Sequence, residues 1–142
     1  MPTAVRLDHD RIRAKLNDIS RSLVRLRNLR TMSREAFLAS EDSQDIARSR
    51  LLTAIEASLN ICYHATARTL QRIPEDYGQC FLLLADAGLI PQDLGERLSA
   101  MARFRNRLVH LYWDIDYSQV YDFLQSDLDD LERFARQAAS WL

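Results

Sequence analysis

The stretch VRLDHDRIRAKLNDISRSLVRLRNLRT, residues 5–31, decides the fold class of this 142-residue chain. Its large apolar residues recur at alternating steps of four and three, the spacing that gathers side chains on one face of an α-helix. The residues of this seam are Ile12, Leu16, Ile19, Leu23 and Leu26. The stretch therefore predicts a long amphipathic helix that packs along its length against partner helices.

Similar apolar faces follow along the rest of the chain, and three glycines and three prolines leave few points at which helices can break. The further expected elements are a helical turn over 33–39 capped by Ser33, a loop over 40–44, a helix from a cap at Asp42 or Ser43 to about 70, a helix over 76–87 closed by Gly88, a helix over 91–110 and one final helix over 118–142. Short connections favour antiparallel neighbours. We expect one all-α domain over residues 1–142, an up-and-down bundle of four to five helices, with enough apolar surface left over for a homodimer.

Charge is unevenly distributed although the formal net charge is only −1, which gives no reason to expect tight non-specific binding to nucleic acid. Residues 1–34 hold nine basic and three acidic residues, whereas residues 114–132 hold seven acidic and no basic ones. Two interpretations stay open. The two segments are complementary solvated faces, or they are a basic wall for phosphates and an acidic rim.

Cys62 and Cys80 stand in apolar surroundings without the spacing of a metal site, and they are expected to be reduced core thiols. No apolar run is long enough for a membrane span, and the start of the chain lacks the apolar stretch of a signal peptide. We therefore expect a cytoplasmic protein. Motifs for phosphate loops, metal ligands and serine nucleophiles are missing, so no cofactor and no metal are predicted.

Candidate site residues crowd the end of the expected helix over 91–110. Arg105, Asn106, His110 and Tyr112 lie within eight residues, and Asn106 is one helical turn before His110, where it could hold the imidazole ring. On a regular helix Arg105 and His110 are about 140° apart, too far to meet one phosphate easily. Either two copies share a cleft, the Arg from one and the His from the other, or the helix unwinds locally.

Such a group suits metal-free cleavage of RNA. A histidine moves a proton to or from the 2′-hydroxyl or the leaving oxygen, and Arg105 offsets charge on the transition state with its bidentate fork. The alternative is structural: the arginines pair with the acidic stretch after Asp114, and His110 caps the helix C-terminus. Arg105, at a helix end, is expected to contribute little core area.

A second polar group is the stripe Glu56, Asn60 and His64, spaced at steps of four on an otherwise apolar helix. It is either a satisfied polar seam between helices or part of the lining of an active cleft.

The sequence resembles the HEPN superfamily and, within it, the HepT toxins. Their hallmark is Arg, a polar residue, a short spacer, then His, one residue and Tyr, and Arg105, Asn106, His110 and Tyr112 match it. Residues 50–64 are similar to the second helix of that family. The resemblance covers nearly the whole chain apart from a generic first helix.

The resemblance implies a dimeric helical bundle in which two motifs build one metal-independent RNase cleft. Arg105 and His110 would be the catalytic pair, with Asn106 and Tyr112 supporting. It also implies a partner, an MntA-like nucleotidyltransferase antitoxin that transfers AMP to Tyr112, although Tyr112 could also simply pack beside Trp113. The competing function is a non-catalytic dimeric helical module that docks a nucleotidyltransferase or RNA.

Overall fold

The computed structural model describes residues 7–110 and 114–142, and every regular element in these ranges is helical. The elements are α1 (His9–Arg30), α2 (Arg34–Leu38), α3 (Glu41–Ala65), the π-helical turn η1 (Thr66–Leu70), α4 (Tyr77–Asp86), α5 (Gln92–His110), α6 (Tyr117–Ser126) and α7 (Leu128–Ala139). The predicted all-α fold is confirmed.

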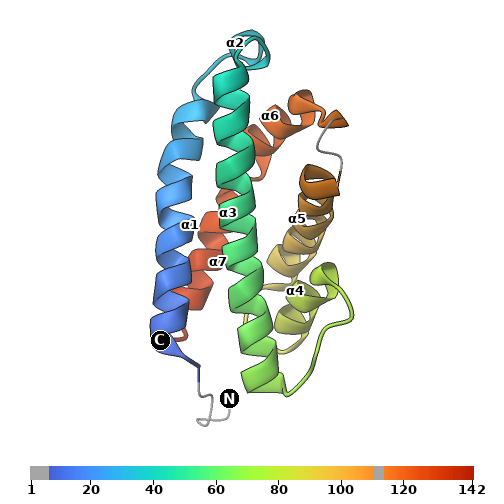
Figure 1. Ribbon diagram of the computed structural model, residues 1–142. Helices are drawn as coiled ribbons and strands as arrows, with labels where there is room; N and C mark the ends of the chain where they lie inside the picture. The colour runs from blue at the N-terminus through green and yellow to red at the C-terminus, as the bar shows by residue number, and fades with distance from the viewer. Residues whose placement is uncertain (1–6, 111–113) are drawn as a thin grey trace.

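Helix α3 is the central element (Figure 1). It packs along α1 on one side and meets α4, α5 and α7 on the others, which accounts for the broad apolar face of its sequence. Helices α4 and α5 form a closely packed antiparallel pair, with Gly88 at a φ of 78° closing α4 as predicted. The end of α5 therefore lies beside the middle of α3, and this places the candidate site.

One hydrophobic core joins these helices. Ile12, Ile19 and Leu26 of the predicted seam are fully buried, and the apolar residues expected on α5 and on the last helix are buried as well. The largest fully buried side chains are Phe37, Phe81, Phe134, Ile12, Ile19, Leu26, Leu51, Ile55, Ile61, Leu84, Leu94 and Leu98. No helix in the described part of the chain is long and apolar enough to cross a membrane.

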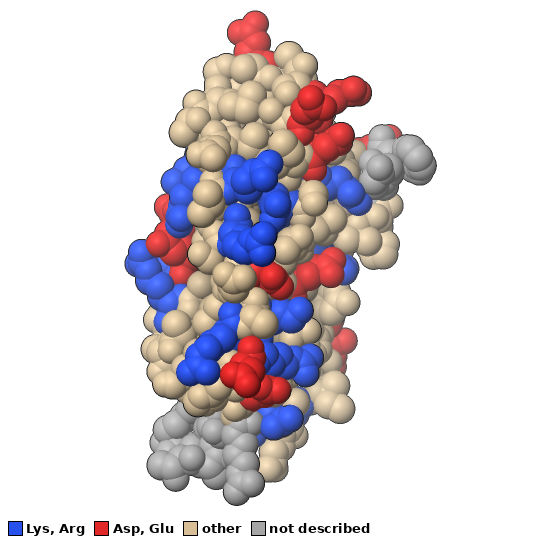
Figure 2. Space-filling view, turned by 60° about the vertical axis from the view of Figure 1, so that its left-hand side comes forward, with Lys and Arg blue, Asp and Glu red and all other residues tan. Residues whose placement is uncertain are grey.

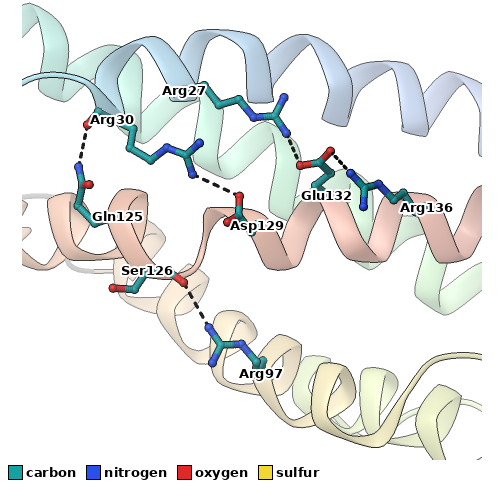
Figure 3. Close-up of polar contacts among 8 residues, drawn as sticks. All are labelled: Arg27, Arg30, Arg97, Gln125, Ser126, Asp129, Glu132 and Arg136. Atoms are coloured by element: carbon teal, nitrogen blue, oxygen red, sulfur yellow. Dashed lines mark hydrogen bonds and ion pairs between the residues drawn. The ribbon is translucent and has the colours of Figure 1, made fainter.

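The basic and acidic segments are complementary faces. Figure 2 shows lysine and arginine side chains in separate groups with acidic side chains between them. Arg27 of α1 pairs with Glu132 of α7 at 2.5 Å, and Arg30 pairs with Asp129 at 3.2 Å (Figure 3). Each exposed pair contributes about 0–1 kcal/mol, so these contacts align α1 with α7 more than they stabilise the fold. For these arginines, the first of the two interpretations of the charge pattern is confirmed.

The final helix is broken at Asp127, so the prediction of one continuous helix is wrong. Arg97 of α5 donates to the main-chain oxygen of Ser126 at 3.3 Å, an oxygen that would accept from Asp130 N in an unbroken helix (Figure 3). Asp130 N bonds instead to Asp127 O at 3.1 Å. The same guanidinium also holds the carboxylates of Asp127 and Asp130. A tertiary contact therefore makes this break without glycine or proline.

The predicted loop over 40–44 is also wrong, because α3 already begins at Glu41. Ser40 is its N-cap and accepts from Ser43 N at 3.2 Å. Glu41 and Asp42 follow in the first turn, where negative charge is favourable next to the helix dipole. Four residues of the expected loop, 41–44, thus belong to α3.

Cys62 of α3 and Cys80 of α4 form a disulfide, with their Cα atoms 6.2 Å apart and both residues fully buried. The prediction of reduced thiols is wrong. The 18-residue separation gave no motif, and only the antiparallel contact of α3 with α4 brings the two sulfurs together.

Candidate functional site

Helix α5 remains regular through His110, so the alternative of local unwinding between Arg105 and His110 is not observed. Five residues of α-helix separate the two side chains by about 140° around the axis and by roughly 7.5 Å along it. A single chain thus presents the guanidinium and the imidazole on different sides of α5.

Arg105 is held by contacts with two other helices. Its Nη2 donates to Glu56 Oε1 of α3 at 3.2 Å, and its guanidinium lies 5.0 Å from the ring centroid of Tyr77 of α4. The side chain is only 15% exposed, and its Nε is buried without a hydrogen-bond partner. The expectation that this residue contributes little packing is wrong, because the contact between α3 and α4 encloses it.

The partner of Arg105 also differs from the structural alternative raised by the sequence. That alternative paired the arginines of this helix with the acidic stretch after Asp114, but the carboxylate beside Arg105 comes from Glu56. The acidic stretch instead forms ion pairs with Arg27, Arg30, Arg34 and Arg97.

Asn106 accepts a hydrogen bond from Arg105 Nη1 at 3.3 Å. In the described residues it makes no hydrogen bond with His110, so the predicted support of the imidazole by Asn106 is not observed. His110 is exposed in the last turn of α5. Tyr112, the remaining predicted site residue, lies outside the described residues.

The polar residues of the α3 stripe, Glu56, Asn60 and His64, contact two different parts of the molecule. His64 Nε2 accepts from the backbone N–H of Asp8 at 2.8 Å, and Asn60 Oδ1 accepts from Arg11 Nε at 3.1 Å. These two residues therefore form the predicted seam, here with the start of α1. Glu56 instead holds Arg105, which ties the stripe to the candidate site.

His64 is 8% exposed, and its imidazole has a lowered pKa. Burial is the main cause, and the positive charges of Arg68 and Arg11 add to it. Nε2 is the acceptor for Asp8 N–H, so the neutral form with its proton on Nδ1 fits the contact.

This burial predicts a pH-dependent stability. Between the ordinary pKa of 6.5 and the lower folded value, the unfolded chain binds a proton that the folded chain does not. The resulting contribution of His64 to the free energy of unfolding is fully present above pH 6.5. It is lost as the pH falls from there toward the folded pKa. Urea unfolding at several pH values between 7 and 5 should show this fall, and His64→Gln, which keeps an acceptor for Asp8, should flatten it. An equal flattening by exposed His9→Gln would contradict the assignment.

Two cavities flank the ring of Tyr77 beside the motif. We call the first, of about 230 Å³, the Tyr63 cavity; it is lined by Glu56, Leu59, Asn60, Tyr63, Tyr77 and Arg105. The second, of about 350 Å³, is lined by Asp76, Tyr77, Gly78, Gln79, Leu82, Ser99, Ala102, Arg103 and Asn106. A larger cavity of about 420 Å³ lies between α5, α6 and α7, and neither Arg105 nor His110 lines it.

The walls of the Tyr63 cavity are partly aromatic. Tyr63 and Tyr77 meet edge to face, with ring centroids 5.9 Å apart. Burial, with the nearby Tyr77 and Asp76, raises the pKa of Tyr63, so its hydroxyl keeps its proton at neutral pH. No group of three or more potential metal ligands was found among the described residues.

Tyr63 and Tyr77 were not among the predicted site residues, and the contact between Glu56 and Arg105 was not predicted either. Tyr77 is 28 residues before Arg105 in the chain and Glu56 is 49 residues before it. Neither spacing carries a local signal, since the contacts depend on how α3, α4 and α5 pack.

Comparison with known proteins gives consistent results. A family model described as "Ribonuclease HepT-like" matches residues 19–138. A tRNA nuclease HepT from Aphanizomenon flos-aquae is 27% identical over 131 residues, 92% of this chain and 89% of the relative. An mRNA nuclease HepT from Shewanella oneidensis is 33% identical over 91 residues, 64% of this chain and 68% of the relative.

Solved structures agree. A tri-AMPylated HEPN toxin from Shewanella oneidensis, in complex with an MNT antitoxin, superposes with a TM-score of 0.83 at 28% identity. The match covers 92% of this chain and 98% of the toxin.

Proposed function

Because the chain belongs to the HepT-like ribonuclease family, we propose that it is an RNase toxin that cleaves RNA without a metal through Arg105 and His110. The observation that carries the proposal is the family match over residues 19–138. This range contains the motif residues Arg105, Asn106 and His110. Relatives named as tRNA and mRNA nucleases support RNA as the substrate.

The proposed chemistry is an in-line transfer at a phosphodiester. The 2′-oxygen attacks phosphorus, its proton leaves to a base, and the departing 5′-oxygen takes up a proton. The exposed imidazole of His110 is accessible for one of these proton transfers. Arg105 offsets the charge that builds on the non-bridging oxygens, since its Nη atoms still have N–H groups beyond those bonded to Glu56 and Asn106.

We further propose that the active cleft combines the Arg105 of one chain with the His110 of another. The regular α5 supports this, since the two groups diverge within one chain. A twofold dimer solves the problem because it brings the same surface of two copies face to face.

Complementation tests the shared cleft. Arg105→Ala and His110→Ala homodimers should both be inactive, whereas co-expressed mixed dimers regain one intact Arg–His pair. With random pairing, half of the dimers are mixed and one of their two pairs is intact, so activity should return to about a quarter of wild type. Two affinity tags verify that mixed dimers form. Mixed dimers without activity would contradict a cleft shared between chains.

The partner of this toxin is an MntA-like nucleotidyltransferase antitoxin that modifies Tyr112. In the transfer, the tyrosine oxygen attacks the α-phosphorus of ATP, releases pyrophosphate and becomes AMPylated. The AMPylated toxin relative, solved with its antitoxin, supports the proposal. An AMP group two residues after His110 would add negative charge that repels RNA phosphate and would block the cleft. Mass spectrometry after incubation with such an antitoxin and ATP should show AMP on wild type and none on Tyr112→Phe.

The alternative is a dimeric module that docks a nucleotidyltransferase or RNA without cleaving. The observation that favours it is the contact of Arg105 with Glu56, which occupies one edge of the guanidinium. Incubating the purified protein with total RNA in EDTA separates the two functions. Cleavage by wild type that His110→Ala lacks supports the enzyme, and intact RNA supports the module.

A further inference from the structure

The Tyr63 cavity has unused hydrogen-bonding capacity. Glu56 Oε1 accepts from Arg105, while Oε2 has no partner within residues 7–110 and 114–142. Asn60 accepts from Arg11 through Oδ1, and its amide N–H groups donate to no described residue. Because each carboxylate oxygen accepts two hydrogen bonds, Glu56 can bind a ligand without releasing Arg105.

Flat groups surround the same cavity. The rings of Tyr63 and Tyr77 and the guanidinium plane of Arg105 all line it. Aromatic rings and arginine planes are the surfaces on which proteins stack unpaired RNA bases. At about 230 Å³ the cavity is small, and it opens next to the proposed phosphate-binding arginine. Its shape and position therefore suit one base of a bound strand.

The carboxylate of Glu56 limits which RNA base fits the Tyr63 cavity. Guanine presents two neighbouring donors, N1–H and N2–H, on its Watson–Crick edge. Adenine and cytosine each present an amino group beside an acceptor nitrogen, and uracil presents one N–H between two carbonyl oxygens. An ionised glutamate accepts hydrogen bonds only, so it matches guanine and is repelled by the acceptors of the others.

We propose that the Tyr63 cavity binds a guanine base of the RNA substrate, with Glu56 accepting from N1–H and N2–H and with Tyr63 stacking on the base. The inference rests on the proposed function, since it places the base beside the phosphate held by Arg105. It makes Glu56 a determinant of which RNA sequences bind, in addition to its contact with Arg105.

The test measures dissociation constants of 5′-GMP and 5′-AMP by equilibrium dialysis with wild-type protein. The two nucleotides share ribose and phosphate, so the ratio of the constants isolates recognition of the base. A bidentate contact predicts GMP binding roughly tenfold tighter than AMP binding. In Glu56→Gln the ratio should fall to about one, because the neutral amide presents a donor as well as an acceptor.

The matched control is Glu41→Gln, which makes the same change of charge in the first turn of α3, away from the cavity. This variant should keep the wild-type GMP/AMP ratio. Removing the charge of Glu56 also strengthens phosphate binding in general, and the ratio is insensitive to that effect. Equal binding of GMP and AMP by wild type, or an unchanged ratio in Glu56→Gln, overturns the proposal.

Tyr63 provides a second measurement. Tyr63→Leu should weaken GMP and AMP by similar factors, about fivefold or more, because stacking tolerates any base. Tyr63→Phe keeps the ring and should bind both nearly as wild type does. Circular dichroism checks that each variant is folded. If Tyr63→Leu binds both nucleotides as wild type does, the base does not lie on Tyr63 and the proposal fails.

Nucleotide binding does not depend on cleavage, so the two proposals can fail separately. Selective GMP binding by a protein that leaves total RNA intact would contradict the proposed RNase function and support the guanine site. Cleavage of RNA by a protein that binds GMP and AMP equally would support the proposed RNase function and contradict the guanine site.

Discussion

Replacing His110 by alanine is expected to reduce the rate of RNA cleavage by about 10²–10⁴-fold, the usual contribution of a side chain that transfers a proton in the transition state. His110 is exposed at the end of α5 and makes no hydrogen bond with another described residue. Its loss should therefore leave the fold and the melting temperature nearly unchanged. The rate is measured on total RNA in the presence of EDTA, with circular dichroism as the check on folding.

The control for this variant is His9→Ala, since His9 is the other exposed histidine of the described chain and lies in the first turn of α1. It should cleave at the wild-type rate. If wild type and His110→Ala degrade RNA equally, the activity belongs to a contaminating nuclease. If both histidine variants lose activity, the loss is not specific to His110.

Arg105→Lys is the second substitution with a large expected effect, a fall in the cleavage rate of about 10²–10³-fold. Lysine keeps the positive charge but cannot form the planar fork, and it loses the stacked contact with Tyr77 at 5.0 Å. Binding of RNA at low salt should weaken much less than the rate, because the charge remains. Single-turnover cleavage and filter binding on the same RNA separate the two quantities.

Arg107→Lys is the matched control, two residues further along α5. Its guanidinium lies 5.6 Å from the ring centroid of Phe104 on the same helix. This exposed arginine should tolerate lysine with less than a threefold change in rate. An equal loss in both variants would show that cleavage responds to the basic character of α5 as a whole, and Arg105 would lose its assigned role.

Apolar spacing was sufficient to predict most helices, because a buried face repeats along the chain whatever it packs against. The seam of α1 and the apolar face of α5 were placed correctly for this reason. The break at Asp127 could not be predicted, since Arg97, 29 residues away from Ser126, causes it by taking a main-chain oxygen. The disulfide of Cys62 and Cys80 also depends on a contact between helices that no motif marks.

The candidate site also combines residues that the local sequence predicts with residues that only tertiary packing brings together. Arg105, Asn106 and His110 could be proposed from the sequence because their motif lies within one helix. Tyr77 and the role of Glu56 were missed, because helices α4 and α3 supply them through packing alone. The predicted bond between Asn106 and His110 assumed that a free side chain takes the nearest partner one turn away, but Asn106 accepts from its neighbour Arg105 instead.

The corner at Asp127 gives Arg97 an influence on residues far from itself. One guanidinium binds the main-chain oxygen of Ser126 and the carboxylates of Asp127 and Asp130, so a single side chain of α5 holds the corner between α6 and α7. With a short apolar residue at position 97, that oxygen would be free to accept from Asp130 N, while the bonds of Tyr121 and Gln125 to main-chain oxygens of residues 30–32 would still hold α6 in place. Arg97 of α5 thus sets the bend between the last two helices of the chain.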